Sequence, residues 1–200
     1  QSNYTPTLVV TYGGLAGDPY WRQATDVFDN PLMVHTPPRQ LIAQTARRVT
    51  APDWAFVDDE AAREAKKLAE RGVKVSIGAH GQQAGVAAHW ELWSFARGGM
   101  TAVEALRAGT IESARSLGMD RDIGSLEVGK SADMIAIDTS SIAQQPLYNI
   151  ASQLVYTNVG HRVTHSWVAA KPLLINGELR TLNEQNVIQT AQQWRNRIAD

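Results

Sequence analysis

The residues best suited to chemistry lie in a glycine-rich segment near the middle of the 200-residue chain. His80 stands between Gly78 and Gly81, directly after residues 73–77, which alternate apolar and polar side chains as a short strand does. In α/β folds, ligands and catalytic groups collect in the loops at the carboxyl ends of strands. Flanking glycines also let a backbone or a ligand approach closely. The pattern predicts that His80 is functional. The alternative is that His80 is a turn residue that forms a hydrogen bond with a neighbouring backbone group.

Two further polar residues, His89 and Glu91, follow at the beginning of the next predicted helix. His80 and His89 are nine positions apart, which is neither a helical pair nor a recognised zinc spacing. Their imidazoles would converge only if the loop at residues 81–85 folds back. The alternative for Glu91 is a carboxylate that the dipole at the beginning of a helix favours.

The other sequence patterns exclude several kinds of chemistry. His161 and His165 are spaced to share one face of a strand, but no third metal ligand lies nearby, which favours a solvated strand face. The absence of cysteine excludes disulfides, thiolate metal sites and cysteine nucleophiles. The sequence also has no Gly-x-Ser-x-Gly nucleophile motif and no glycine-rich phosphate loop followed by Lys-Ser/Thr.

The composition is that of a folded protein with balanced charge. Hydrophobic residues make up 44% of the chain and charged residues 20%, which is ordinary for a globular domain. Nineteen basic residues against 20 acidic residues give a net charge of −1. This balance argues against a nucleic acid or an anionic membrane bound through bulk charge. No apolar run approaches the ~18 residues that a membrane span needs, so we expect neither kind of partner.

The elements that must position His80 form half of a parallel α/β unit. Residues 6–12 are β-branched and aromatic, which predicts a buried strand. Residues 58–71 carry a helical apolar face, and the strand at residues 73–77 follows them after a glycine. A further helix is predicted over residues 88–97. This order of helix, strand, loop and helix is typical of an α/β fold.

The remaining elements are two helices followed by a strand-rich segment. A capping box of Thr101 and Glu104 predicts a helix over residues 102–108, and Thr110 is expected to cap the next helix. Short apolar runs then predict strands over residues 134–137, 154–156, 163–168 and 173–175, with a hairpin turn at Asn176-Gly177. A second capping box, Thr181 with Glu184, begins an amphipathic helix with the apolar face Val187, Ala191, Trp194 and Ile198.

Two stretches of the chain resemble the amidohydrolase superfamily. Residues 98–118 are similar to the helix pair after the last barrel strand of those enzymes, and residues 123–138 resemble the turn and strand where they leave the barrel. The resemblance implies an α/β fold, with residues 1–122 as the C-terminal part of a (β/α)8 metal-dependent hydrolase barrel. Residues 123–200 would form a small β-rich domain with a terminal helix. Because a full barrel needs ~250 residues, the resemblance covers the C-terminal portion of an enzyme.

The two ends of the chain resemble different branches of this superfamily. Residues 1–135 resemble imidazolonepropionase-like and prolidase-like amidohydrolases, through residues 12–14, 78–82 and 89–91. Residues 132–200 resemble the tails of methylthioadenosine/S-adenosylhomocysteine deaminases, through residues 145–148, 152–156, 167–169 and 194–198. The first branch implies hydrolysis of an amide, cyclic amide or amidine C–N bond. The second implies deamination of a purine nucleoside or a related ring, and the combination is also compatible with a chimera.

The resemblance assigns roles to individual residues and implies a divalent metal, with zinc expected, that polarises bound water. His80 would be a metal ligand and a catalytic residue, Glu91 a second catalytic residue, and His89 and Gln82 contacts to a small-molecule substrate. Ala79-His80 stands where Thr-Asp is usual, and the His-x-His pair of the first barrel strand is absent from the sequence. We therefore expect the chain alone to be inactive without an N-terminal portion.

A different interpretation is a non-catalytic α/β module that acts in binding or assembly. The strands at residues 8–12 and 73–77 would then be exposed edges that favour a homo-oligomer. The resemblance leaves the compartment open, because propeller-fused amidohydrolases are often exported and the deaminases are cytoplasmic. The cytoplasm is slightly favoured.

Overall fold

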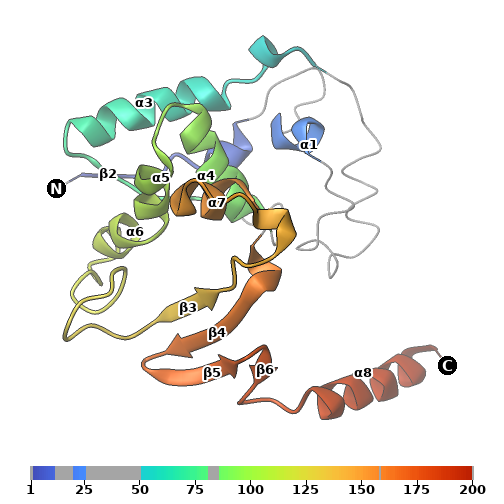
Figure 1. Ribbon diagram of the computed structural model, residues 1–200. Helices are drawn as coiled ribbons and strands as arrows, with labels where there is room; N and C mark the ends of the chain where they lie inside the picture. Colours follow the sequence, from blue (N-terminus) through green and yellow to red (C-terminus); the bar gives the residue numbers. More distant parts are fainter. Residues whose placement is uncertain (1, 12–19, 26–50, 81–85, 158, 200) are drawn as a thin grey trace. The chain divides into compact units, whose positions relative to one another are not determined.

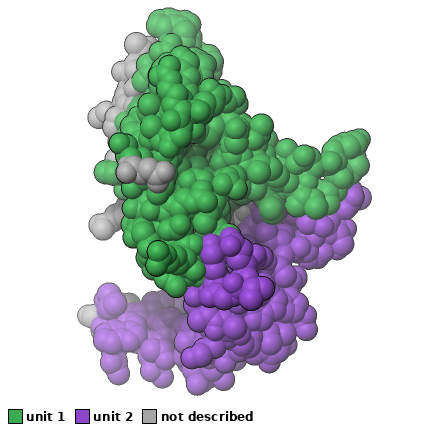
Figure 2. Space-filling view, turned by 90° about the vertical axis from the view of Figure 1, so that its left-hand side faces the viewer, with its two compact units in different colours: residues 1–125, 146–158 green, residues 126–145, 159–200 purple. Residues whose placement is uncertain are grey.

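The computed structural model describes residues 2–11, 20–25, 51–80, 86–157 and 159–199 (Figure 1). The chain divides into two compact units, which Figure 2 shows in different colours. The first unit comprises residues 1–125 and 146–158, and the second comprises residues 126–145 and 159–200. The predicted domain ranges, 1–122 and 123–200, stay a prediction.

A two-stranded parallel sheet lies in the first unit. Strand β1 (Asn3–Tyr4) pairs with β2 (Lys74–Val75), with Asn3 opposite Lys74 and Tyr4 opposite Val75. β2 is shorter than the predicted strand at residues 73–77. The strand predicted at residues 6–12 is wrong in its described part, because Leu8–Val10 form a 3-10 helix, η1. Thr7, with φ of 52°, turns the chain out of the extended conformation before η1.

Helices surround this sheet and make the unit an α/β fold (Figure 1). The larger ones, α3 (Asp58–Glu70), α4 (Ala87–Arg97) and α5 (Ala102–Gly109), confirm the three helices predicted over these stretches. The smaller elements are α1 (Tyr20–Ala24), η3 (Asp53–Ala55), α6 (Ile111–Ser116) and α7 (Ile150–Tyr156). The apolar faces meet in a core of Leu8, Ala62, Ala65, Val75, Phe95, Met100, Ala105 and Ala108.

Helix α7 replaces the strand predicted at residues 154–156, so that prediction is wrong. The Asn149 side chain accepts a hydrogen bond from the Ser152 N–H (2.9 Å), which caps the helix. Val155 is fully buried, and its carbonyl accepts a hydrogen bond from Trp93 Nε1 of α4. The cap and the buried contacts therefore outweigh the β propensity of this apolar run.

The capping box predicted at Thr101 is present. The Glu104 N–H donates to Thr101 Oγ1 (3.2 Å), and the Thr101 N–H donates to Glu104 Oε2 (2.7 Å). Thr110 is the N-cap residue of α6 as predicted, but its side chain makes no capping bond, because its hydroxyl donates to the Leu106 carbonyl (2.8 Å). Thr110 thus closes the last turn of α5.

The second unit contains a four-stranded antiparallel sheet in the order β3-β4-β5-β6. Strands β3 (Met134–Ile137), β4 (Val163–Val168) and β5 (Lys171–Ile175) confirm three predicted strands, and β6 (Glu178–Leu179) follows. The hairpin turn between β5 and β6 is also confirmed. Asn176 and Gly177 have φ of 52° and 79°, the pair of left-handed conformations that a type I′ turn requires.

The predicted terminal helix is present as α8 (Glu184–Ala199), but its predicted capping box is wrong. The helix begins at Glu184, and Asn183 Oδ1 accepts the Asn186 N–H at 3.0 Å in place of a Thr181 cap. None of the described helices has the length and apolar character that crossing a membrane requires.

Candidate functional site at the carboxyl ends of β1 and β2

The segments that follow β1 and β2 lie side by side because the two strands are parallel. Thr5 Oγ1 and Ser76 Oγ share a hydrogen bond of 2.8 Å. Further along, Gly78 packs against Thr7 so closely that a Cβ on Gly78 would lie 2.7 Å from the Thr7 Cα. Only glycine fits this backbone approach. The two segments thus form one edge, at the end of which stands His80.

Left-handed backbone conformations gather at this edge. Thr7, Ala79 and His80 have φ of 52°, 46° and 49°. For a β-branched residue such as Thr7 this conformation is an outlier, and each such residue costs about 1–3 kcal/mol unless its surroundings hold it. Strained residues of this kind cluster at functional sites. His80 itself is exposed, so its imidazole is accessible to a ligand.

A buried carboxylate, that of Glu91 on α4, joins the two segments. Its side chain is completely enclosed, with an exposed fraction of 0%. The Leu8 N–H donates to Oε1 (2.9 Å) and the Val9 N–H donates to Oε2 (3.1 Å). Burial raises the pKa of Glu91, while hydrogen bonds from these amides and from those of Thr7 and Gly78 act in the opposite direction. The carboxylate therefore ties the segment after β1 to the segment after β2.

His89 lies on the first turn of α4 and is half-buried. Its ring centroid is 6.1 Å from that of Trp93, and its Nδ1 has no hydrogen-bond partner among the described residues. Burial lowers the pKa of His89, which favours the neutral imidazole. Gln82 lies outside the described residues, within the segment that connects His80 to α4. The roles predicted for the four site residues, His80, Gln82, His89 and Glu91, stay predictions.

The described residues do not fit a complete metal site. No group of three or more His, Asp or Glu side chains among them could hold a metal ion, so His80 would be a single donor. The idea that His161 and His165 share a strand is wrong, because His161 belongs to a 3-10 helix, η5 (Gly160–Arg162), before β4. His165 stacks on Trp167 with ring centroids 5.4 Å apart and planes inclined by 10°.

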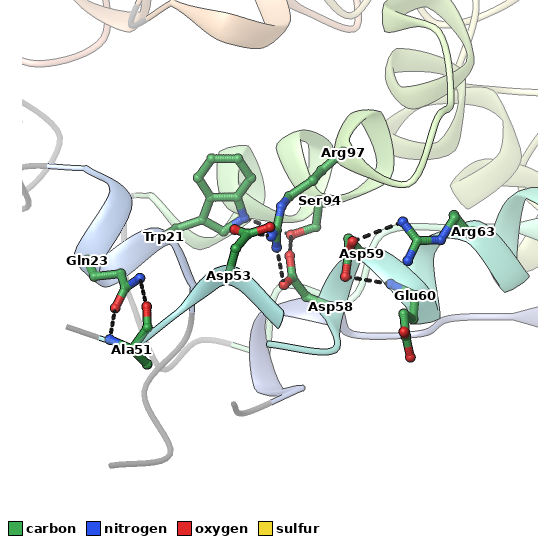
Figure 3. Close-up of polar contacts among 10 residues, drawn as sticks. All are labelled: Trp21, Gln23, Ala51, Asp53, Asp58, Asp59, Glu60, Arg63, Ser94 and Arg97. Carbon is green, nitrogen blue, oxygen red and sulfur yellow. Dashed lines mark hydrogen bonds and ion pairs between the residues drawn. The ribbon is translucent and has the colours of Figure 1, made fainter. Parts of the chain in front are cut away.

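A buried ion pair joins α4 to the beginning of α3 (Figure 3). Arg97 Nη1 lies 2.6 Å from Oδ1 of Asp58, the first residue of α3. Ser94 Oγ donates to Asp58 Oδ2 (3.0 Å) and accepts a hydrogen bond from Trp21 Nε1 (2.7 Å). Burial raises the pKa of Asp58, although Arg97 and Ser94 oppose that shift.

This ion pair extends to two more elements of the first unit. Arg97 Nη2 lies 2.7 Å from Asp53 Oδ1 of η3, and the guanidinium covers the Tyr20 ring of α1 at 3.5 Å from its centroid. Sequence reasoning missed this network. The available signal was the spacing of Ser94 and Arg97, which places these two polar residues on one face of α4. By fixing α4 against α3, the network also fixes the position of Glu91.

Comparison with known proteins identifies the class of the chain. The model of the amidohydrolase family matches residues 33–178, so the chain belongs to the amidohydrolase family. This match confirms the resemblance found in the sequence. The 5-methylthioadenosine/S-adenosylhomocysteine deaminases of Teredinibacter turnerae and Saccharophagus degradans are 44% and 46% identical to it over 94 residues. Each match covers 47% of this chain and 21% of the relative.

The chain is also similar to solved structures. An adenosine deaminase from Xanthomonas campestris with bound zinc is 32% identical, with a TM-score of 0.57 over 68% of this chain and 34% of that chain. Atrazine chlorohydrolase from Arthrobacter aurescens, complexed with zinc, is 17% identical, with a TM-score of 0.54 over 74% of this chain and 39% of that chain. The latter similarity concerns the fold alone. The chain thus spans about a fifth of the length of the first curated relatives and about a third of the adenosine deaminase.

Proposed function

We propose that the chain supplies the C-terminal portion of a metal-dependent amidohydrolase that hydrolyses a C–N bond. The observation that carries this proposal is the 44% and 46% identity to two proteins named as 5-methylthioadenosine/S-adenosylhomocysteine deaminases. These relatives favour a ring amidine carbon over an amide as the point of attack. Attack at a ring carbon is also what the resemblance of residues 132–200 implies. We also infer that β1 and β2 are neighbouring strands of a (β/α)8 barrel and that the second unit is the small β-rich domain.

The reaction that fits this family is hydrolytic deamination. Water adds to the ring carbon that bears the amino group, and ammonia leaves, so that an adenine nucleoside and water give a hypoxanthine nucleoside and ammonia. The attacking water gives up both of its protons, one to the departing amino group and one to the neighbouring ring nitrogen, and its oxygen becomes the ring carbonyl. An imidazole can accept and return a proton. We assign this task to His80, because it is exposed at the strand ends where barrel enzymes place their catalytic groups.

The enclosed carboxylate of Glu91 is suited to positioning. Both of its oxygens accept backbone N–H groups, from Leu8 and Val9, and a substrate cannot reach a side chain that is fully buried. In this proposal Glu91 holds the two strand-end segments together and thereby sets the place of His80. His89, kept neutral by burial, and Gln82 remain the proposed substrate contacts.

A panel of substrates tests the proposal. The chain is co-expressed with the N-terminal portion of the Teredinibacter turnerae deaminase, and ammonia release is measured with adenosine, 5′-methylthioadenosine, a cyclic amide and a dipeptide. We expect ammonia from a nucleoside, and none from either portion alone. Hydrolysis of the cyclic amide or dipeptide alone would replace the nucleoside assignment with an amide substrate. A folded complex that hydrolyses none of the four compounds would contradict C–N hydrolysis.

A further inference from the structure

The terminal helix α8 presents an apolar stripe that no described residue of its own unit covers. Its residues are exposed throughout, with Val187 53%, Trp194 56% and Ile198 80% exposed, and Ala191 lies between them. The spacing of these four residues, four, three and four positions, is the seam pattern of a two-stranded coiled coil. A continuous apolar stripe of this kind marks an interaction surface.

The spacing of the seam is the same when it is followed from either end. In an antiparallel pair of identical helices, Val187 of one copy meets Ile198 of the other, and Ala191 meets Trp194. Both contacts then occur twice, as the two-fold symmetry of a homodimer requires. The seam is therefore complementary to itself.

The charges of α8 are also arranged for this orientation. Glu184 stands in the first turn, whereas Arg195 and Arg197 stand near the end of the helix. The Arg197 guanidinium lies 5.4 Å from the centroid of the Trp194 ring, beside the seam. Antiparallel pairing brings Arg195 and Arg197 of each helix nearer to Glu184 of the other than parallel pairing does, and parallel pairing places like charges together.

We propose that α8 pairs in antiparallel orientation with α8 of a second copy of this chain. The proposal is independent of the catalytic function. At about 1.5 Å per residue the helix is only about 24 Å long, so the buried area is small and the dimer is weak. A dissociation constant in the micromolar range is expected for such an interface.

Sedimentation velocity of the full chain over about a hundredfold range of concentration tests whether α8 mediates dimerisation. We expect a monomer–dimer equilibrium that Val187→Asp shifts at least about tenfold toward monomer. Gln189→Asp, which adds the same charge on the opposite face of α8, should leave the equilibrium unchanged. A chain that is monomeric at every concentration, or a Val187→Asp variant as dimeric as the wild type, would overturn the proposal.

Charge exchange separates a lost interface from a damaged helix. Glu184→Arg alone should weaken the dimer, and Glu184→Arg combined with Arg197→Glu should restore it, with the same helical signal in circular dichroism for all variants. A double variant that stays as weak as the single one would contradict the charge pairing.

The absence of native cysteine makes the orientation directly testable. In a mixture of Val187→Cys and Ile198→Cys chains, oxidation should give a disulfide-linked dimer, while each variant alone should stay unlinked. Efficient cross-linking of Val187→Cys with itself would show a parallel pair and overturn the antiparallel arrangement.

Discussion

Replacement of Glu91 by glutamine should loosen the edge that carries His80. The carboxylate receives the N–H groups of Leu8 and Val9 on different oxygens, at 2.9 Å and 3.1 Å. Glutamine keeps the size of the side chain but has a single oxygen. Its NH2 group must then face one of these N–H donors, which leaves that backbone donor buried without an acceptor.

The cost follows from these contacts. A hydrogen bond to a charged group contributes about 1.5–3 kcal/mol, and an unsatisfied buried donor costs about 1–3 kcal/mol. Burial of the Glu91 charge is itself unfavourable, as the raised pKa shows, so removal of the charge returns part of that cost. A net loss of about 2 kcal/mol in the free energy of unfolding is therefore expected for Glu91→Gln, which is a large part of the typical total of about 5–15 kcal/mol.

Urea unfolding followed by tryptophan fluorescence measures this loss, because Trp90 and Trp93 lie on the same helix as Glu91. The matched control is Glu64→Gln on α3, an exposed glutamate whose partner is Lys67, and it should leave the unfolding midpoint unchanged. If Glu91→Gln unfolds at the same urea concentration as the wild type and the control, the carboxylate does not hold the two strand-end segments together.

Three further predictions concern single side chains. Gly78→Ala should destabilise the chain by about 3 kcal/mol in urea unfolding, because the new Cβ would lie 2.7 Å from the Thr7 Cα; a cost near zero would refute this backbone contact. Thr101→Ala should cost about 1 kcal/mol in the same assay through loss of the α5 cap, and an unchanged midpoint would contradict it. Burial raises the pKa of the Asp58 carboxyl in the folded chain. The contribution of this group to the free energy of unfolding is therefore fully present below the ordinary carboxyl pKa and is lost as the pH rises through its pKa in the folded chain. The stability of the wild type relative to Asp58→Asn should therefore fall as the pH rises above the ordinary carboxyl pKa; a rise would show that Arg97 dominates.

The helices and the β-rich segment were predictable because their signals are local. The capping box at Thr101, the apolar periodicity of α3 and the Asn176-Gly177 turn each depend on neighbours in the sequence. Predictions failed where one residue redirects the backbone. Thr7 converts an apolar run into η1, and Asn149 begins a helix where β-branched and aromatic residues suggested a strand.

The candidate site was predictable only in outline. The place of His80 after a strand follows from the sequence, and β2 confirms that strand. The bonds from Leu8 and Val9 to Glu91, by contrast, join residues separated by 83 and 82 positions. The pairing of Asp58 with Arg97 spans 39 positions. Such contacts depend on how helices pack, which a periodic pattern in a single sequence does not specify.

The most direct test of the central claim is the rate of ammonia release from the nucleoside substrate by the co-expressed complex, with His80→Ala against the wild type. His161→Ala, which removes an imidazole from η5 in the second unit, is the matched control. If His80 transfers protons at the strand ends, its loss should lower the rate by about 100-fold or more, while His161→Ala keeps the wild-type rate. A His80→Ala complex as fast as the wild type would contradict a catalytic edge at β1 and β2.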